Sequence, residues 1–234
     1  MTDAHCHVSC GDPSVRELLV GRDFFGVHPW ETLDETTETG GTTETRRALV
    51  SDVSFLPALR SKLLANPNAG VGEIGLDRLK SRDISPRMRE VFEAQLALAL
   101  ELHRPVVLHG AKCWGQVVAA VKRWTGDGLV TGDKRQAFLF HGFSRSDGLI
   151  PEIVKLNGFI SVGPAVLNDH AVNYRELVKK IPLDRLLVET DRTSSSDSPS
   201  ISDILAKTAD ILNLSAAELE RITDENADRF LGAV

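Results

Sequence analysis

The sequence contains too few cysteines for a disulfide framework. It has three, at positions 6, 10 and 113, whereas small disulfide-stabilised domains carry dense, even-numbered sets. The spacing of Cys6 and Cys10 is not that of a CxxC redox motif or zinc knuckle. We therefore expect a reduced, cytoplasmic protein.

Long apolar runs are also missing. No stretch of about 18 apolar residues occurs, which is roughly the least that a membrane-spanning helix needs. The polar residues Asp3 and His5 stand where the apolar region of a signal peptide would begin. We expect neither a membrane span nor a secretory leader.

An excess of positive charge is the third missing feature. The chain has 27 Lys and Arg against 33 Asp and Glu, a formal net charge of −6. Proteins that coat duplex DNA without sequence preference are usually basic, because phosphate neutralisation drives that binding. Any phosphate on a substrate of this protein must therefore be met locally, through metal ions or a basic loop.

Short apolar runs alternate with helical segments along most of the 234 residues. Helical periodicity is strongest in residues 87–103 and recurs in 53–65, in 115–124, before Asn157 and in two closing segments. This alternation predicts βα units and a parallel sheet. Eight such strands in a chain of this length predict a single α/β domain, residues 1–234, folded as a distorted TIM-like (β/α)8 barrel. The predicted strands lie near residues 3–8, 16–21, 23–28, 69–73, 105–109, 137–141, 158–162 and 186–190.

Two segments depart from a regular barrel. The first crossover, after the strand near 3–8, is too short for a full helix, so we expect the distortion there. Residues 31–46 consist mainly of Thr, Glu and Gly with almost no apolar side chains, and such a segment cannot bury enough surface to order itself. We predict a mobile insert here rather than a linker between domains.

Polar residues recur at the ends of the predicted strands. His5 and His7 are one residue apart in a strand, so both rings point to the same face. Any single histidine could simply pack against a backbone carbonyl, and a carboxylate could cap a helix. At the face of a barrel where catalytic residues converge, the whole set predicts a functional site. Its other members are His28, Glu73, His109, His141 and Asp191.

Seven motifs occur in a fixed order along the chain. They are DAHCHV, GVHPWE, VGEIGLD, RPVVLHGAKCWG, FHGFSRS, LLVETD and T-x-x-N-x-x-R-F at residues 223–230. This set resembles the TatD-type deoxyribonuclease family, which are metal-dependent hydrolases with a (β/α)8 barrel. The resemblance covers nearly the whole chain except residues 31–46 and the short first crossover. The combination HxH…GEIGLD…ETD is specific, whereas a single V-L-H or H-G fragment is not.

The resemblance implies a site for two divalent metal ions. Two such ions orient a shared water, lower its pKa and stabilise the leaving oxygen of a phosphodiester. Imidazoles and carboxylates suit zinc, manganese or magnesium, so the ligand set does not determine which metal binds. Glu73 and Asp191 are the implied catalytic residues, and Asp191 could hold or deprotonate the attacking water. The implied ligands are His5 and His7 for one ion, His109 and His141 for the other, Glu73 between them, and Asp191 in the shell of the first ion.

Five further residues could support the ligands or contact the substrate. Glu189 shares the strand face of Asp191, and Asp77 is expected to brace its loop. His28 would touch substrate or pack beside Pro29 and Trp30. Lys112 is the nearest cation to a position where the family often has a charged residue, and Arg145 stands where the family often has glycine.

The loop after Glu73 is rich in cations. Either it steers phosphate groups toward the site, or it is an ordinary solvated loop. The residues are Arg78, Lys80, Arg82, Arg87 and Arg89.

Three functions remain open from the sequence. The first is a metal-dependent phosphodiesterase acting on single-stranded DNA, on DNA ends or on a small phosphoester. The second keeps the barrel and its metals but hydrolyses an amide, lactone or other ester of a small molecule. The third is a non-catalytic barrel that serves as a binding partner. We expect a monomer with no membrane association.

Overall fold

The structure, a computed structural model, describes residues 1–33, 53–126, 136–194 and 199–232. Within these ranges, strands form at all eight predicted places, and every strand pair is parallel. The strands are β1 (Thr2–Cys6), β2 (Arg16–Leu19), β3 (Phe24–Phe25), β4 (Gly70–Asp77), β5 (Val106–Ala111), β6 (Phe138–Phe140), β7 (Gly158–Val162) and β8 (Leu186–Val188).

The strands are joined into a distorted barrel. Strands β3 to β8 form one sheet in sequence order, and β1 pairs with β2. A parallel bridge between Val20 and Phe24 joins β2 to β3. On the other side, the backbone N–H of Asp191 donates to the carbonyl of His5 at 3.0 Å, which ties the end of β8 to β1. The predicted TIM-like barrel is thus confirmed.

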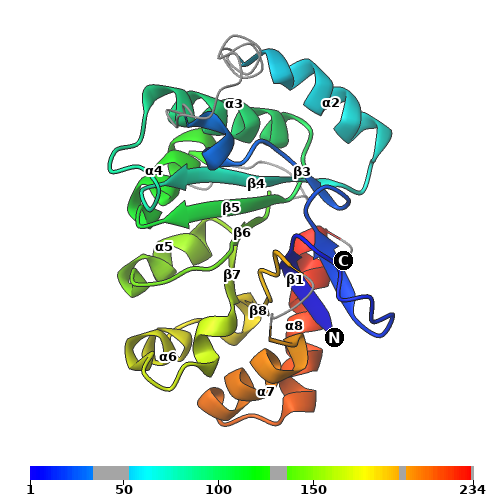
Figure 1. Cartoon of the computed structure of the whole chain (residues 1–234), viewed down its shortest axis with the longest axis vertical. Coiled ribbons are helices and arrows are strands. Elements are labelled where there is room, and N and C mark those ends of the chain that lie inside the picture. The colour runs from blue at the N-terminus through cyan, green and yellow to red at the C-terminus, as the bar shows by residue number, and fades with distance from the viewer. Residues whose placement is uncertain (34–52, 127–135, 195–198, 233–234) are drawn as a thin grey trace, which may run out of the picture.

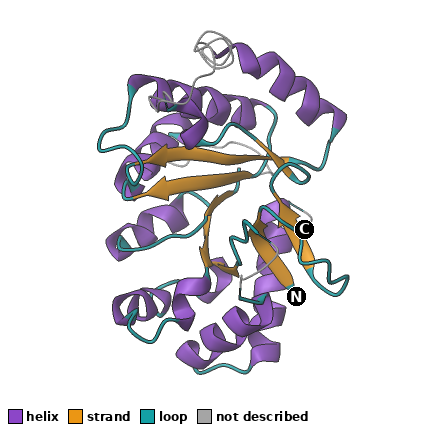
Figure 2. Ribbon diagram, viewed as in Figure 1, coloured by secondary structure: helices purple, strands orange, loops and turns teal. Residues whose placement is uncertain are grey.

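Helices surround most of the barrel (Figures 1 and 2). No helix connects β1 to β2 or β2 to β3, because residues 7–15 and 20–23 are too few for one. This is the expected distortion. Helix α6 (Val172–Val178) was not predicted. Every helix among the described residues falls short of the length and hydropathy that a membrane span needs. The helices are α2 (Leu56–Ala65), α3 (Pro86–Glu101), α4 (Trp114–Thr125), α5 (Ile150–Lys155), α6 (Val172–Val178), α7 (Ile201–Leu212) and α8 (Ala216–Leu231).

Helix α3 shows how local sequence sets an element boundary. Ser85 caps its N-terminus by accepting a hydrogen bond from the N–H of Met88 at 3.0 Å, and Pro86 occupies the first turn. Its buried face includes Val91, Phe92 and Leu96. Burial of this apolar stripe against the sheet, more than intrinsic propensity, stabilises such a helix.

Helix α8 attaches the end of the chain to β8 and to the barrel interior. The side chain of Asn226 donates to the carbonyls of Leu183 and Leu186, both at 2.7 Å. Phe230 is buried, with its ring centroid 5.9 Å from those of Phe24 and Phe159. The motif T-x-x-N-x-x-R-F therefore has a packing role.

Period-two alternation in the strands separates the two sides of the barrel wall. Val106 and Leu108 of β5 pack with the helices in the larger apolar cluster, whereas Val107 belongs to the inner cluster with Phe230. His109 follows on the face of Val107. The same spacing joins Leu139 to His141 and Leu187 to Glu189. Apolar side chains thus fill one end of the interior, and polar side chains occupy the other.

The segment predicted as a mobile insert begins in ordered structure. Glu31 and Thr32 belong to a short 3-10 helix, η1 (Pro29–Thr32). Glu31 Oε1 accepts a hydrogen bond from the N–H of His28 at 2.8 Å, which closes a capping box. A cap thus gives these two residues a regular conformation without apolar burial. Residues 34–46 lie outside the described part of the chain.

Candidate metal centre

Glu73 lies at the centre of the polar end of the barrel, and its Oε1 atom faces two histidines from neighbouring strands. His109 Nδ1 lies 2.5 Å and His141 Nε2 lies 2.6 Å from this oxygen. These two ring nitrogens are 3.4 Å apart. A third ring, that of His28, places Nε2 at 3.4 Å from the same oxygen.

The other oxygen of Glu73 faces the N-terminal histidine pair. His5 Nε2 and His7 Nε2 each lie 3.3 Å from Oε2. Asp191 Oδ1 closes this side, at 3.8 Å from His5 Nε2 and 3.6 Å from His7 Nε2. The two oxygens of one carboxylate are therefore shared between two groups of imidazoles.

The position of Glu73 within its strand differs from the prediction. We expected β4 to end at Glu73, but the strand continues to Asp77. The pairing register between β4 and β5 shifts between Val71 and Ile74, on either side of Glu73. Such an irregularity re-aims a side chain, and it allows a residue in the middle of a strand to meet residues from strand ends.

The electrostatics of Glu73 and His141 depend on each other. Burial alone raises the pKa of the Glu73 carboxyl, but the charge of His141 and hydrogen bonds from His109 and His141 outweigh it and hold that pKa well below its usual range. Burial lowers the pKa of His141, but the carboxylates of Glu73 and Glu189 raise it well above the ordinary value. The interior thus contains anionic oxygen and imidazole donors in close contact.

Two buried ring nitrogens have no hydrogen-bond partner among the described residues. They are His5 Nε2 and His141 Nδ1. A buried polar atom without a partner is unfavourable, and His5 Nε2 points into the space between Glu73 and Asp191. A divalent cation would satisfy it, because neutral imidazole and carboxylate are common ligands of such ions. The residues present therefore fit a metal.

Asp77 contacts both its own loop and the site. Its Oδ1 accepts hydrogen bonds from the N–H groups of Leu79 at 2.6 Å and Lys80 at 2.9 Å. Its Oδ2 lies 2.8 Å from His109 Nε2 and accepts from the indole N–H of Trp30 at 2.8 Å. These bonds hold the pKa of Asp77 below its usual range although burial opposes them. Asp77 therefore orients the His109 ring from behind.

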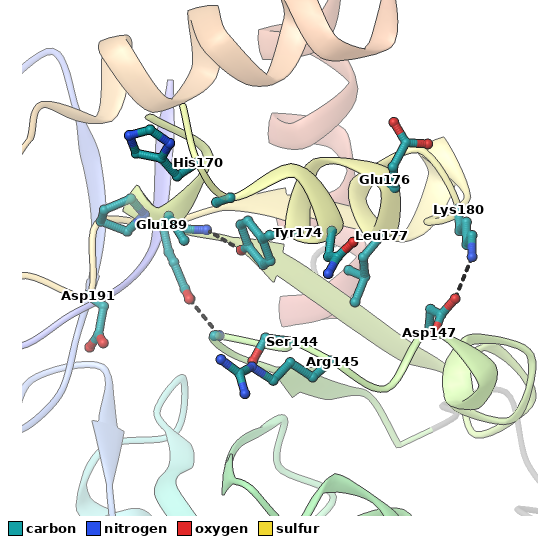
Figure 3. Close-up of a pocket in the computed structure, with 16 residues that line it drawn as sticks. Ser144, Arg145, Asp147, His170, Tyr174, Glu176, Leu177, Lys180, Glu189 and Asp191 are labelled. Carbon is teal, nitrogen blue, oxygen red and sulfur yellow. Dashed lines mark hydrogen bonds and ion pairs between the residues drawn. The ribbon is translucent and has the colours of Figure 1, made fainter. Parts of the chain in front are cut away.

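Glu189 supports the other side of the site. Its Oε1 accepts from the N–H of Gly142 at 2.6 Å, and its Oε2 accepts from the Ser161 hydroxyl at 2.5 Å. Oε1 also lies 3.7 Å from His141 Nδ1. Figure 3 shows Glu189 between the segment that carries Asp191 and the loop that follows His141.

A family model described as TatD related DNase matches residues 21–232. The chain belongs to the TatD-related DNase family. It is thus a metal-dependent hydrolase that acts on ester bonds, which agrees with the centre described above.

Individual relatives agree with this membership. The Bacillus subtilis (strain 168) protein described as uncharacterized metal-dependent hydrolase YabD is 28% identical over 229 residues, which cover 92% of this chain and 80% of that protein. The 3′-5′ ssDNA/RNA exonuclease TatD of Klebsiella pneumoniae (strain 342) is 34% identical over 122 residues, 52% of this chain and 44% of the relative. The crystal structure of the TatD homologue YjjV from Escherichia coli K12 matches with a TM-score of 0.67 and 24% identity, covering 94% of this chain and 78% of that one.

Two predicted residues of this TatD-family chain lie outside the histidine cluster. Lys112 is exposed just after β5, and no hydrogen bond or ion pair joins its side chain to another described residue. Arg145 is also exposed, and it lines a cavity that reaches Asp191. The other predicted residues, His28 included, come together around Glu73 or contact its partners.

Side chains of the cationic loop make defined contacts. Lys80 Nζ lies 3.4 Å from the centroid of the Trp30 ring, a cation–π geometry. Arg78 Nε donates to the carbonyl of Arg82 at 3.0 Å. Arg78, Lys80 and Arg82 are exposed, so their charges remain open to solvent.

Two supporting residues were missed by the sequence analysis. Gln95 is fully buried on α3, accepts from the N–H of Val27 at 2.7 Å and donates to its carbonyl at 3.1 Å, which fixes the backbone beside His28. Asp3 accepts from the N–H and hydroxyl of Thr190 at 2.9 and 2.6 Å, next to Asp191. Burial raises the pKa of Asp3 to about 6 despite these bonds. A polar Gln within the apolar stripe of residues 87–103 was the available signal for Gln95.

Proposed function

We propose that this chain is a phosphodiesterase that uses two divalent metal ions to hydrolyse DNA, at its ends or in short single strands. The single observation that carries the proposal is the position of Glu73. One of its oxygens faces His109 and His141, and the other faces His5 and His7. A carboxylate shared in this way is what a bridging ligand between two neighbouring ions requires.

The proposed ligands divide into two groups. His5, His7 and Asp191 offer atoms that all lie within 4.8 Å of one another, which supports the assignment of these three to one ion. His109 and His141 would hold the second ion with Glu73 Oε1. His28 forms a further group with Glu73 and His109, so we propose that it borders the second ion rather than packing passively. Zinc, manganese and magnesium all remain compatible with these donors.

The chain's own residues would prepare the site for hydrolysis. Divalent ions bound here would lower the pKa of a water and stabilise charge on the leaving oxygen. Asp191 is 45% exposed, so its carboxylate is accessible to accept a proton from the attacking water. Asp77 orients the ring of His109 through a hydrogen bond, and the carboxylate of Glu189 lies 3.7 Å from His141 Nδ1. The ring of His109 is therefore fixed before substrate arrives.

The nucleic-acid substrate is proposed from the relatives and the local charge. The Klebsiella pneumoniae relative is described as a 3′-5′ ssDNA/RNA exonuclease. The net charge of −6 disfavours extended duplex binding, whereas the exposed cations of the loop after Glu73 could meet the phosphates of a single strand. We further infer that residues 1–234 act as one domain and as a monomer.

A metal-controlled nuclease assay tests this function. Reconstituted protein should contain two divalent ions per chain and degrade end-labelled single-stranded DNA, and chelation should stop the reaction. His141→Ala should abolish cleavage. His103→Asn is the control, because His103 is exposed, lies before β5, and has a φ of 52° that asparagine tolerates. DNA cleavage that survives both chelation and His141→Ala would contradict the proposal, as would turnover of small carboxylic esters but of no phosphodiester.

A further inference from the structure

A cavity of about 920 Å³ opens beside Asp191. The loop at residues 142–147, after β6, forms one wall, and the segment from Gly163 to α6 forms the other (Figure 3). Ligand-binding cavities commonly have volumes of roughly 300–1,000 Å³. Because Asp191 and Glu189 lie at one end of this space, a substrate bound at the metal centre can extend into it.

Most charges along the cavity are already paired. Lys180 forms an ion pair with Asp147, which joins the two walls at the end far from Asp191 (Figure 3). Glu176 pairs with Lys179 at 2.7 Å. Glu189 accepts hydrogen bonds from Gly142 and Ser161. The charges at the far end are thus balanced by ion pairs, whereas the carboxylates of Glu189 and Asp191 lie at the end nearest the metal centre.

Arg145 differs from Lys180, the other lysine or arginine among the described residues that line the cavity. No hydrogen bond or ion pair joins its guanidinium to another described residue, and the side chain is exposed on the cavity wall. It follows His141 by four residues in the same loop. The backbone segment that carries this histidine of the metal centre therefore also carries Arg145. A free guanidinium beside a phosphodiesterase centre is suited to a phosphate, which it can bind with two parallel hydrogen bonds.

The backbone at Arg145 is in the left-handed region, with a φ of 60°. Side chains with a Cβ atom adopt this region less readily than glycine. Glycine at this position would therefore keep the loop conformation while removing the charge, so a glycine variant is expected to fold.

We infer that Arg145 binds a backbone phosphate of the substrate strand in this cavity, next to the phosphodiester that is cleaved. The inference rests on the proposed function. Arg145 thereby distinguishes substrates that carry a second phosphate from small phosphodiesters that do not. It is a binding residue for the strand and takes no part in the hydrolytic step.

The test compares two substrates and three variants of the metal-loaded protein. The substrates are a short oligothymidylate and bis(p-nitrophenyl) phosphate, which has no second phosphate to reach the cavity. The variants are Arg145→Gly, Arg145→Lys and the control Arg221→Ala, which removes an exposed arginine from α8 that pairs with Glu225. Rates are measured over a series of salt concentrations.

For the oligonucleotide, Arg145→Gly should raise KM about tenfold or more, since a hydrogen bond to a charged group is lost. The slope of log(kcat/KM) against log[salt] should become shallower by about 0.7, the value for one phosphate contact on a single strand. Arg145→Lys should keep the wild-type slope. Hydrolysis of bis(p-nitrophenyl) phosphate should be unchanged in every variant, and Arg221→Ala should match wild type on both substrates.

The alternative outcomes separate this inference from the proposed function. An Arg145→Gly enzyme with wild-type KM and salt slope on the oligonucleotide overturns the phosphate contact and leaves the phosphodiesterase intact. An equal loss on both substrates also overturns it, because Arg145 would then affect the metal centre itself. A wild-type protein that hydrolyses neither substrate with any divalent ion overturns the proposed function and this inference together.

Discussion

His109 Nε2 lies 2.8 Å from Asp77 Oδ2, and the opposite nitrogen of the same ring, Nδ1, lies 2.5 Å from Glu73 Oε1. Asp77 accepts hydrogen bonds from three other groups, so only donors surround it. His109 must therefore carry its proton on Nε2 when the ring is neutral, which leaves Nδ1 free to bind a cation. A carboxylate on β4 thus sets the tautomer of a histidine on β5.

Substitution Asp77→Asn should weaken metal binding without unfolding the protein. Asparagine has one acceptor oxygen, so it cannot accept both from the loop N–H groups and from His109 Nε2. If its N–H₂ group faces His109, it favours the tautomer with the proton on Nδ1. Loss of such a supporting group typically lowers metal affinity or activity about 10–100-fold. Metal titration followed by activity checks this, with Asp83→Asn in the same loop as the control. Unchanged affinity in Asp77→Asn would show that His109 needs no such support.

Divalent metal should stabilise the fold through Glu73. An ion that binds only the folded state raises stability by about 2.7 kcal/mol at a concentration 100 times its Kd. Thermal melts of chelated protein should therefore rise in Tm as metal is added. Glu73→Gln should remove that rise, whereas Glu101→Gln, an exposed glutamate paired with Arg60, should keep it. A rise in Tm that persists in Glu73→Gln would place the ion elsewhere.

Gln95 should matter to both stability and the position of His28. In Gln95→Leu, the part-buried N–H and carbonyl of Val27 lose their partner, and an unpaired group costs up to about 1–3 kcal/mol when it is fully buried. Urea unfolding should show this loss, and activity should fall because His28 follows Val27 directly. The control is Gln116→Leu, since Gln116 is exposed on α4. Equal stability of the two variants would argue against the contact.

Phe230 should be needed for the barrel and not for the metal. Its ring packs between those of Phe24 and Phe159, so Phe230→Ala should lower the free energy of unfolding by about 3–5 kcal/mol. Leu231→Ala, at a half-buried neighbour, should lower it much less. Metal affinity of the folded Phe230→Ala protein should remain at the wild-type value. A fall in metal affinity would mean that the packing around Phe230 also positions the metal ligands at the polar end of the interior.

Several features of this protein could be predicted from local pattern. The eight strands, the short first crossover and helices α2, α3, α4, α5, α7 and α8 followed from hydrophobic periodicity and breaking residues. The end of β4 did not, because the irregular pairing around Glu73 depends on β5. Helix α6 was missed because its seven residues contain too little periodic pattern to distinguish it from a loop.

The sequence by itself determined which donor atoms are available and that they share the interior of a barrel. Alternation with a period of two places His109 on the face of Val107 and His141 on the face of Leu139, whatever the rest of the chain does. Only the tertiary structure decided which oxygen of Glu73 faces which histidines, that His28 joins them, and that Asp77 and Gln95 support the site. Contacts of this kind join residues that are far apart in the sequence; Asp3 and Thr190, beside Asp191, are 187 positions apart. They form only when neighbouring strands fix their register.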